Sequence, residues 1–204
     1  MSDPGQSTSD HRPIAAFDFD GTITRRDTLV PFLAEVAGWP RVGLAAARHA
    51  RSFRDRDVAK ERVLARVLRG RDAGQLTEHG ERYAARLRTE IRPETLERIE
   101  FHRDAGHELV IVSASLVYYL RPIAAELGFH DVIGVEMVVG DQGVLTGSLS
   151  RPNVRAEQKA TRLREWWGDR PATELWAYGN SAGDEALLAM ADHPTWVGSR
   201  ADRN

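Results

Sequence analysis

The sequence of 204 residues contains no cysteine, so it can form no disulfide, no thiolate metal site and no cysteine nucleophile. A chain without disulfides fits a reducing compartment, and we expect a cytoplasmic protein. No apolar stretch is long enough to span a bilayer, and residues 1–13 lack the apolar centre of a signal peptide. Because these first residues are polar and rich in turn formers, we expect a disordered tail.

Lysine is scarce as well: the chain has two, Lys60 and Lys159, among 28 basic residues. Residues 25–90 hold fifteen Arg and Lys against nine Asp and Glu, a net charge of +6, although the whole chain carries −2. This segment forms either a solvated helical surface or an attractor for an anionic substrate. Aromatic residues are sparse there and no recognition motif is present, so we expect no nucleic-acid partner.

The basic segment is predicted to be helical. Gly38 and Pro40 are expected to end its first helix, and Asp57 to cap its third. Four helices between two strands indicate a bundle inserted into another domain. Apolar side chains recur at helical spacing in residues 28–37, 41–53, 58–68 and 73–89.

The stretch FDFDGTIT at 17–24 follows a short apolar strand at 14–16. If the strand continues to Gly21, alternation places Asp18 and Asp20 on one side, near the carboxyl end where α/β sheets bind ligands. Two carboxylates that lose hydration need a shared proton, a basic side chain or a metal ion to compensate, and oxygen ligands without His or Cys favour Mg²⁺. The alternative is a solvated turn, against which the two flanking phenylalanines argue.

A second strand with a polar end is predicted at 108–112, after a helix at 93–105. It ends in Ser113, and a further helix is predicted at 116–127, for which Ser115 is the better candidate cap. Serine at the end of a strand is weak evidence by itself, because serine commonly caps helices.

Three polar residues stand out in the last third of the chain. Lys159 follows a hairpin predicted from β-forming runs at 132–139 and 144–150, to which we assign no catalytic role. A compact ammonium can neutralise a phosphate and a carboxylate together. The alternative interpretation is that Lys159 is a solvated lysine on a helix. Asn180 and Asp184 follow a strand that begins at Leu175.

These four stretches, in this order, resemble the motifs of the haloacid dehalogenase-like hydrolases, and within them the phosphoserine phosphatase-like subfamily with a helical cap (subfamily IB). FDFDGTIT is similar to the motif D-x-D-G-T. The resemblance implies that Asp18 is the nucleophile that forms an aspartyl-phosphate and that Asp20 is the general acid and base. It also implies phosphate contacts from Ser113, Ala114, Lys159 and the backbone around Phe19, Gly21 and Thr22.

The resemblance implies a Mg²⁺ site made by Asp18, Asp20, Asn180 and Asp184. Asn180 departs from the acidic residue of the pattern and offers a neutral carbonyl oxygen in its place. Asp184 is expected to ligate the ion, to bind a metal-bound water or to orient Lys159, with a helix cap as the alternative.

Asp27 matches a residue that contacts the amino group of the substrate in phosphoserine phosphatases. The alternative is an N-cap for the helix that starts at Thr28, and the two roles can coexist.

The predicted fold is α/β: a three-layer Rossmann-like core with a mainly parallel sheet, made by residues 14–24 and 91–204, plus an inserted helical bundle, the cap, at 25–90. The predicted function is a Mg²⁺-dependent phosphomonoester phosphatase for a small, phosphoserine-like metabolite. A phosphotransferase, a lipid-phosphate phosphatase and a catalytically weak binding protein supported by Asn180 are the alternatives. We expect no transmembrane segment, leave peripheral contact with anionic lipid open, and predict no oligomeric state.

Overall fold

A computed structural model describes residues 12–49, 56–169 and 174–198. Most of the predicted tail, residues 1–11, lies outside the described residues, as does the end of the predicted second helix, residues 50–53.

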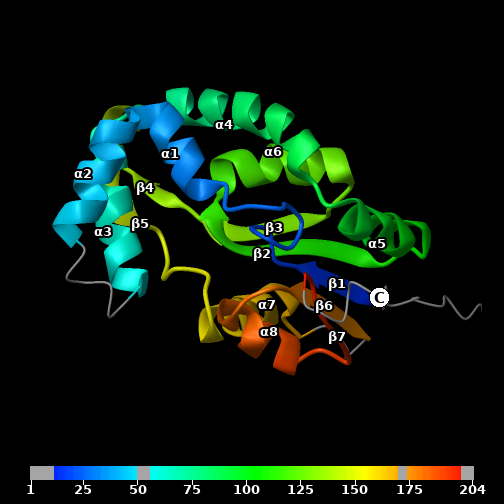
Figure 1. Ribbon diagram of the computed structural model, residues 1–204. Coiled ribbons are helices and arrows are strands. Elements are labelled where there is room, and N and C mark those ends of the chain that lie inside the picture. The colour runs from blue at the N-terminus through cyan, green and yellow to red at the C-terminus, as the bar shows by residue number, and fades with distance from the viewer. Residues whose placement is uncertain (1–11, 50–55, 170–173, 199–204) are drawn as a thin grey trace, which may run out of the picture.

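Parallel strands form a five-stranded central sheet in the order β3-β2-β1-β6-β7 (Figure 1). The strand β1 lies in the middle, and its last residue pairs with Ile111 of β2 on one side and Tyr178 of β6 on the other. The segments that leave these three strands therefore meet at one edge of the sheet. The strands are β1 (Ile14–Phe17), β2 (Glu108–Leu116), β3 (Asp131–Val135), β6 (Leu175–Gly179) and β7 (His193–Trp196).

Helices cover both faces of this sheet (Figure 1). On one face lie α5 (Pro93–Asp104) and α6 (Val117–Leu127), and on the other α7 (Glu157–Trp167) and the short α8 (Glu185–Ala189). The predicted three-layer α/β core is thus confirmed. Short 3₁₀ turns occur at η2 (Arg88–Glu90), η3 (Asp141–Gly143) and η4 (Ala182–Asp184).

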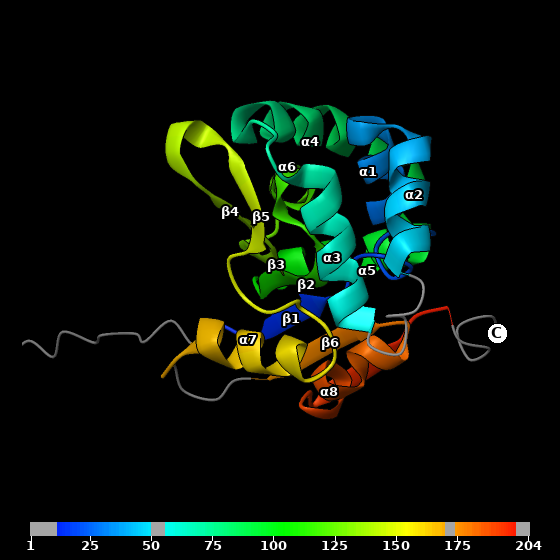
Figure 2. The same ribbon diagram turned by 90° about the vertical axis from the view of Figure 1, so that its left-hand side faces the viewer.

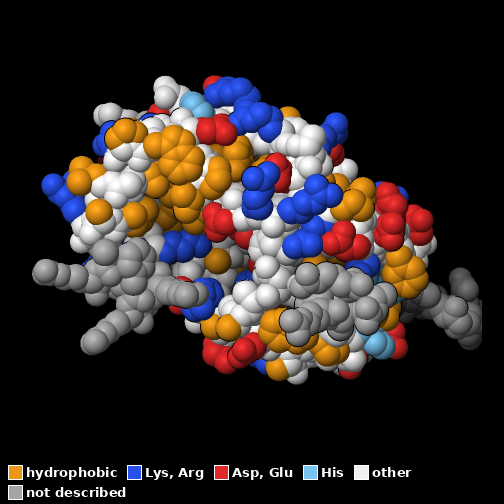
Figure 3. All heavy atoms as spheres, viewed as in Figure 1, with side chains coloured by type: hydrophobic (Ala, Val, Ile, Leu, Met, Phe, Trp, Pro, Cys, Tyr) orange, Lys and Arg blue, Asp and Glu red, His pale blue; other side chains and the backbone are white. Residues whose placement is uncertain are grey.

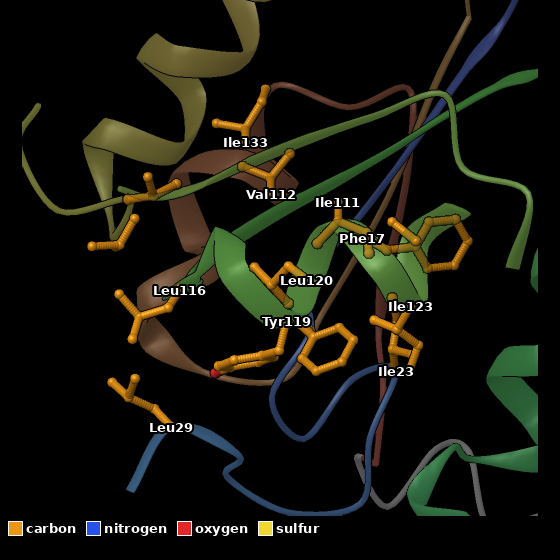
Figure 4. Packing of buried hydrophobic residues seen from close by; sticks show 14 of the residues in the cluster. Phe17, Ile23, Leu29, Ile111, Val112, Leu116, Tyr119, Leu120, Ile123 and Ile133 are labelled. Carbon is orange, nitrogen blue, oxygen red and sulfur yellow. The ribbon is translucent and has the colours of Figure 1, made fainter. Parts of the chain in front are cut away.

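The core holds β1 rigidly in place. Phe17 is fully buried, and its ring stacks on that of Tyr178 with 4.3 Å between the centroids. Figure 4 shows Tyr119 and Leu120 of α6 near Ile111 of β2 and Phe17. Burying each such side chain contributes about 1.5–3 kcal/mol, which fixes the position at which β1 ends.

Four further helices stand between β1 and α5 in the sequence: α1 (Leu29–Ala37), α2 (Trp39–His49), α3 (Arg56–Leu68) and α4 (Ala73–Leu87). We call them the cap. The chain leaves and rejoins the core side by side, because the Arg25 amide donates to the Glu90 carbonyl (2.9 Å) and the Arg92 amide to the Ile23 carbonyl (2.9 Å). Helix α4 lies along α6, and a Cβ on its Gly80 would come within 2.1 Å of the Tyr118 carbonyl oxygen.

The hairpin differs from the prediction, in which residues 132–139 formed its whole first strand. That run serves two sheets: Ile133 and Val135 are buried in β3, whereas β4 (Met137–Val139) pairs with β5 (Leu145–Leu149). The continuous β-forming sequence hid the break between them. The hairpin also reaches the cap, since Leu145 exchanges backbone hydrogen bonds with the residues that follow α3 (Figure 2).

The helix α1 ends at Ala37 with Gly38 as its C-cap, as predicted. Two predicted helix starts in the cap were wrong. The helix α2 begins at Trp39 and not at residue 41, so Pro40 lies in its first turn, where a missing amide hydrogen costs nothing. The helix α3 begins at Arg56 and not at residue 58, so Asp57 lies inside its first turn, where its carboxylate accepts a hydrogen bond from Asn153 Nδ2 (2.6 Å). No helix in the described ranges has the length and apolar character that crossing a membrane requires.

Candidate active site

The first site residue, Asp18, directly follows β1, and its amide donates to the Tyr178 carbonyl (2.9 Å). The prediction that the strand continues to Gly21 was wrong, because the amides of Ile23 and Thr24 turn back to the Phe19 carbonyl (2.9 and 3.0 Å). A turn, and not strand alternation, therefore returns Asp20 to the side of Asp18. Both carboxylates line the same cavity.

Lys159 lies between two carboxylates in the interior. Its Nζ is 2.5 Å from Asp18 Oδ1 and 2.6 Å from Asp184 Oδ1, and all three residues are buried. Burial lowers the pKa of Lys159, but Asp18 and Asp184 outweigh burial and raise it above its ordinary value. Burial raises the pKa of Asp18 against the opposing charge of Lys159. The triad therefore holds a charged lysine beside a carboxylate that is poorly solvated.

Asp184 uses both carboxylate oxygens within the protein. While Oδ1 faces Lys159, Oδ2 accepts hydrogen bonds from the Asn180 amide (3.1 Å) and from the amide and hydroxyl of Ser181 (both 2.9 Å). The carboxylate is the N3 member of a capping box at η4, and it also fixes the ammonium of Lys159. It makes no side-chain cap hydrogen bond to the following helix α8, which was its alternative role. A Cβ on Gly179 would lie 2.5 Å from Asp184 Cβ, so glycine permits this approach.

Asp20 is held by three donors. Oδ1 accepts from the amide (2.7 Å) and hydroxyl (2.6 Å) of Thr28 at the start of the cap, and Oδ2 accepts from the Ser115 hydroxyl. Burial, together with the nearby charge of Asp27, raises the pKa of Asp20 to about 6 although these hydrogen bonds lower it. The prediction that Ser115 caps α6 was wrong, because β2 continues to Leu116, which occupies the N-cap position.

Lys60 is a site residue that the sequence reasoning missed. From cap helix α3 it donates to the Ala114 carbonyl and to Asn153 Oδ1 (3.3 Å). Burial lowers its pKa to about 8, although Asp20 and other carboxylates oppose the shift. The scarcity of lysine, which drew attention to Lys159, pointed equally to Lys60.

The predicted phosphate-binding residues differ in their freedom to bind. Ser113 and Ala114 line the cavity, and Ser113 Oγ accepts a hydrogen bond from the Ser115 amide (3.2 Å). Gly21 lines it as well, but the Thr22 amide already donates to the carbonyl of Phe19 (3.2 Å). The Thr22 hydroxyl donates to Asp18 Oδ2 (3.0 Å).

The two aspartates, both lysines and Ser113 open into one cavity of about 420 Å³ between the cap and the core, whereas Phe19 and Thr22 do not line it. Asp27 lines it and also accepts a hydrogen bond from the Val30 amide (3.1 Å) in the first turn of α1, although the N-cap position itself is Thr28. Cations from the core, from the chain that enters the cap and from cap helix α3 face the same space. They are Arg25, Arg26, Lys60, Arg155 and Lys159.

The donor set fits a hard cation bound by few carboxylates. Asp18, Asp20 and the Asn180 amide group supply oxygen atoms, and no cysteine or histidine lines the cavity. Within the described ranges, three acidic, His or Cys side chains nowhere gather as a metal site, so a cation held here would also need the Asn180 oxygen. Asn180 lies against Gly21, where a Cβ would come within 2.0 Å of its Nδ2.

Fold and site together define an α/β enzyme whose acidic, lysine-containing site lies at the carboxyl edge of a parallel sheet, below inserted helices. A family model for haloacid dehalogenase-like hydrolases matches residues 15–189. The chain belongs to this family, as its motifs predicted, and is a hydrolase.

The relatives of the chain include named phosphatases. Protein CicA of Caulobacter vibrioides is 34% identical over 191 residues, which cover 89% of this chain and 85% of CicA. A histidinol-phosphatase of *Neisseria meningitidis* is 27% identical over 130 residues, 61% of this chain and 58% of that protein. A solved complex of phosphoserine phosphatase with its substrate has a TM-score of 0.64 at 18% identity, covering 88% of this chain and 83% of that one, and thus shares the fold.

Proposed function

We propose that the chain is a Mg²⁺-dependent phosphomonoester hydrolase that works through a phosphorylated Asp18. The observation that carries the proposal is the Asp18 carboxylate itself. It lies at the end of a rigid central strand, between the Lys159 ammonium (2.5 Å) and the Thr22 hydroxyl (3.0 Å), and it lines the cavity. A fixed, poorly hydrated carboxylate is suited to attack phosphorus.

In the first half of the reaction, an Asp18 oxygen bonds to phosphorus and the bond from phosphorus to the leaving alkoxide breaks. Asp20 gives its proton to that alkoxide. In the second half, Asp20 takes a proton from water, whose oxygen bonds to phosphorus and releases Asp18 and inorganic phosphate. The raised pKa of Asp20 supports this role, because a carboxyl with a pKa of about 6 can hold and release a proton near neutral pH.

The remaining residues bind and orient. Lys159 neutralises the phosphoryl group and Asp18 together, and Ser113 donates to the phosphate. Asp184 is assigned as a positioning residue for Lys159, because its Oδ1 faces the ammonium while its Oδ2 accepts hydrogen bonds from Asn180 and Ser181 of its own turn. Mg²⁺ would be held by Asp18, Asp20 and Asn180, and when bound it offsets negative charge and polarises the phosphoryl oxygens.

The leaving group lies on the cap side of the cavity, where Asp27 and Lys60 offer opposite charges. This favours a small metabolite with polar or charged groups beside the phosphate, and phosphoserine is one such compound. The names of the histidinol-phosphatase and phosphoserine phosphatase relatives support a small phosphorylated substrate.

The test is phosphate release from a panel of phosphomonoesters with and without Mg²⁺, by the parent and by Asp18→Asn. We expect release that requires the metal and is lost in the variant. Addition of an alcohol acceptor separates hydrolysis from phosphotransfer, because a transferase forms a new ester. If the folded parent neither releases phosphate nor binds Mg²⁺ in calorimetry, the proposal fails and a binding function replaces it.

A further inference from the structure

The cap helix α2 has apolar side chains on two opposite faces. Val42 and Ala45 point inward and are 5% and 0% exposed. On the outward face, Trp39 is 64% exposed and Leu44 is 51% exposed. At 100° per residue, the exposed residues of this face fall within an arc of about 140°. They are Trp39, Pro40, Gly43, Leu44 and Ala47.

This outward face is wider than a single exposed side chain. Val30 on the neighbouring helix α1 is 44% exposed, and Figure 3 shows hydrophobic side chains gathered over α1 and α2. Isolated apolar residues on a surface are ordinary, whereas a contiguous group that includes a tryptophan indicates a contact surface. A helix that needs only its inner face for packing has no folding reason to keep Trp39 outside.

Arginines border the apolar face. Arg41 of α2 and three arginines of α3 line one groove between the two helices, and no acidic residue lines that groove in the described structure. The charge of Arg41 adds to burial in lowering the pKa of Arg71, which shows how crowded the positive charge is. The exposed acidic residue of α3 that lies nearest in sequence to these arginines is Glu61. The α3 arginines are Arg62, Arg66 and Arg69.

We propose that the cap docks on anionic phospholipid bilayers through the outward face of α2, with Trp39 and Leu44 entering the boundary between headgroups and acyl chains and the groove arginines binding lipid phosphates. Interfacial helices combine these features: an apolar face, a tryptophan and flanking arginines. A second copy of the chain fits less well, because a two-fold contact would bring two arginine groups together. Nucleic acid would leave the apolar face uncovered.

The docking surface lies away from the catalytic cavity. On a helical projection of α3, Arg62 and Arg66 stand at about 200° and 240° from Lys60, which points into the cavity. A membrane bound at the arginines would therefore leave the cavity open to soluble substrates. The proposal concerns attachment, needs no particular reaction and does not depend on the proposed function.

The test is sedimentation of the full chain with vesicles of phosphatidylcholine alone or of phosphatidylcholine and phosphatidylglycerol in equal parts. We expect binding to the anionic vesicles only, weakened by added salt. Arg41→Glu with Arg66→Glu should weaken binding by about 25-fold or more, since each cation near an anionic surface contributes about fivefold. Trp39→Ser with Leu44→Ser should weaken it by about tenfold or more.

The matched control is Phe101→Ser with Arg103→Glu on core helix α5, where Phe101 is 60% exposed, and it should bind as the parent does. Circular dichroism confirms folding, and Leu44→Ser alone replaces the apolar double variant if that one unfolds. Absence of binding to anionic vesicles, or equal losses in the control, would overturn the proposal. A lipid-free dimer that the Trp39 variant dissociates would assign the face to a second copy of the chain.

Discussion

The close approach of Gly21 to Asn180 makes a sharp prediction about the proposed metal site. Gly21 has φ of +81°, and a Cβ there would lie 2.0 Å from Asn180 Nδ2, whereas ordinary contact begins at 3.4 Å. Gly21→Ala therefore forces Asn180 away by about 1.4 Å. A displacement of that size in a catalytic group lowers turnover by about a hundredfold.

The backbone adds a separate cost, because an alanine at positive φ destabilises the fold by about 1–2 kcal/mol. Gly106→Ala is the matched control. Gly106 has φ of +74° and nothing within 4 Å of its Cβ position, so it carries the backbone cost without the clash. Urea unfolding should show a loss of the free energy of unfolding for Gly106→Ala from the backbone alone, and an equal or larger loss for Gly21→Ala, which also bears the clash.

Activity separates the two variants. Steady-state phosphate release across a Mg²⁺ titration should show a lower kcat and a higher half-saturating Mg²⁺ concentration for Gly21→Ala, and parental values for Gly106→Ala. In an Asn180→Ala background, Gly21→Ala should add only the backbone cost. Equal kcat and Mg²⁺ dependence in Gly21→Ala and Gly106→Ala would refute the assignment of Asn180.

Four further predictions concern other parts of the molecule. His102 is fully buried, and burial followed by the charge of His107 lowers its pKa to about 4 from 6.5. The unfolded chain then binds more protons between these values, so stability present above pH 6.5 falls by about 2 kcal/mol near pH 5. In urea unfolding, His102→Phe should lose correspondingly less free energy of unfolding than the parent when the pH falls from above 6.5 to near 5. Gly80→Ala, which meets a carbonyl at 2.1 Å, should cost about 1–3 kcal/mol of unfolding free energy in the same assay. Gly43→Ala, with open space around its Cβ position, should gain up to about 1 kcal/mol. Lys60→Met removes the ammonium that joins α3 to the core, and such a hydrogen bond is worth about 1.5–3 kcal/mol. The variant should raise KM about tenfold in phosphate release. An unchanged KM would exclude a contribution of Lys60 to substrate binding.

The core was predictable because its signals are local. Each strand that carries a motif is a short apolar run, and each is followed by a polar residue and a helix, so the parallel sheet and its functional edge follow from pattern alone. Lys159 could be singled out in the same way, because lysine is rare in the chain. Its role stays a prediction, as does the cap boundary at residues 24 and 91.

Other features depended on contacts between distant segments. The sequence contained a continuous β-forming run at 132–139, but burial of Ile133 against the sheet and exposure of Val139 divided it between two sheets. Ser115 had the local character of a helix cap, and only the approach of Asp20, 95 residues away, gave it another partner. A short pattern cannot report such a partner.

The sequence by itself determined the family, the α/β core and the acidic residues at the end of β1, because motif order and apolar periodicity are properties of contiguous residues. Only the tertiary structure decided what surrounds those acids. The turn at Phe19 brings Asp20 back beside Asp18, α3 carries Lys60 into the cavity, and Asp184 reaches Lys159. These arrangements arise when segments far apart in the chain pack together. Their hydrogen bonds, and the shifts of pKa that they and burial cause, exist only in the folded state.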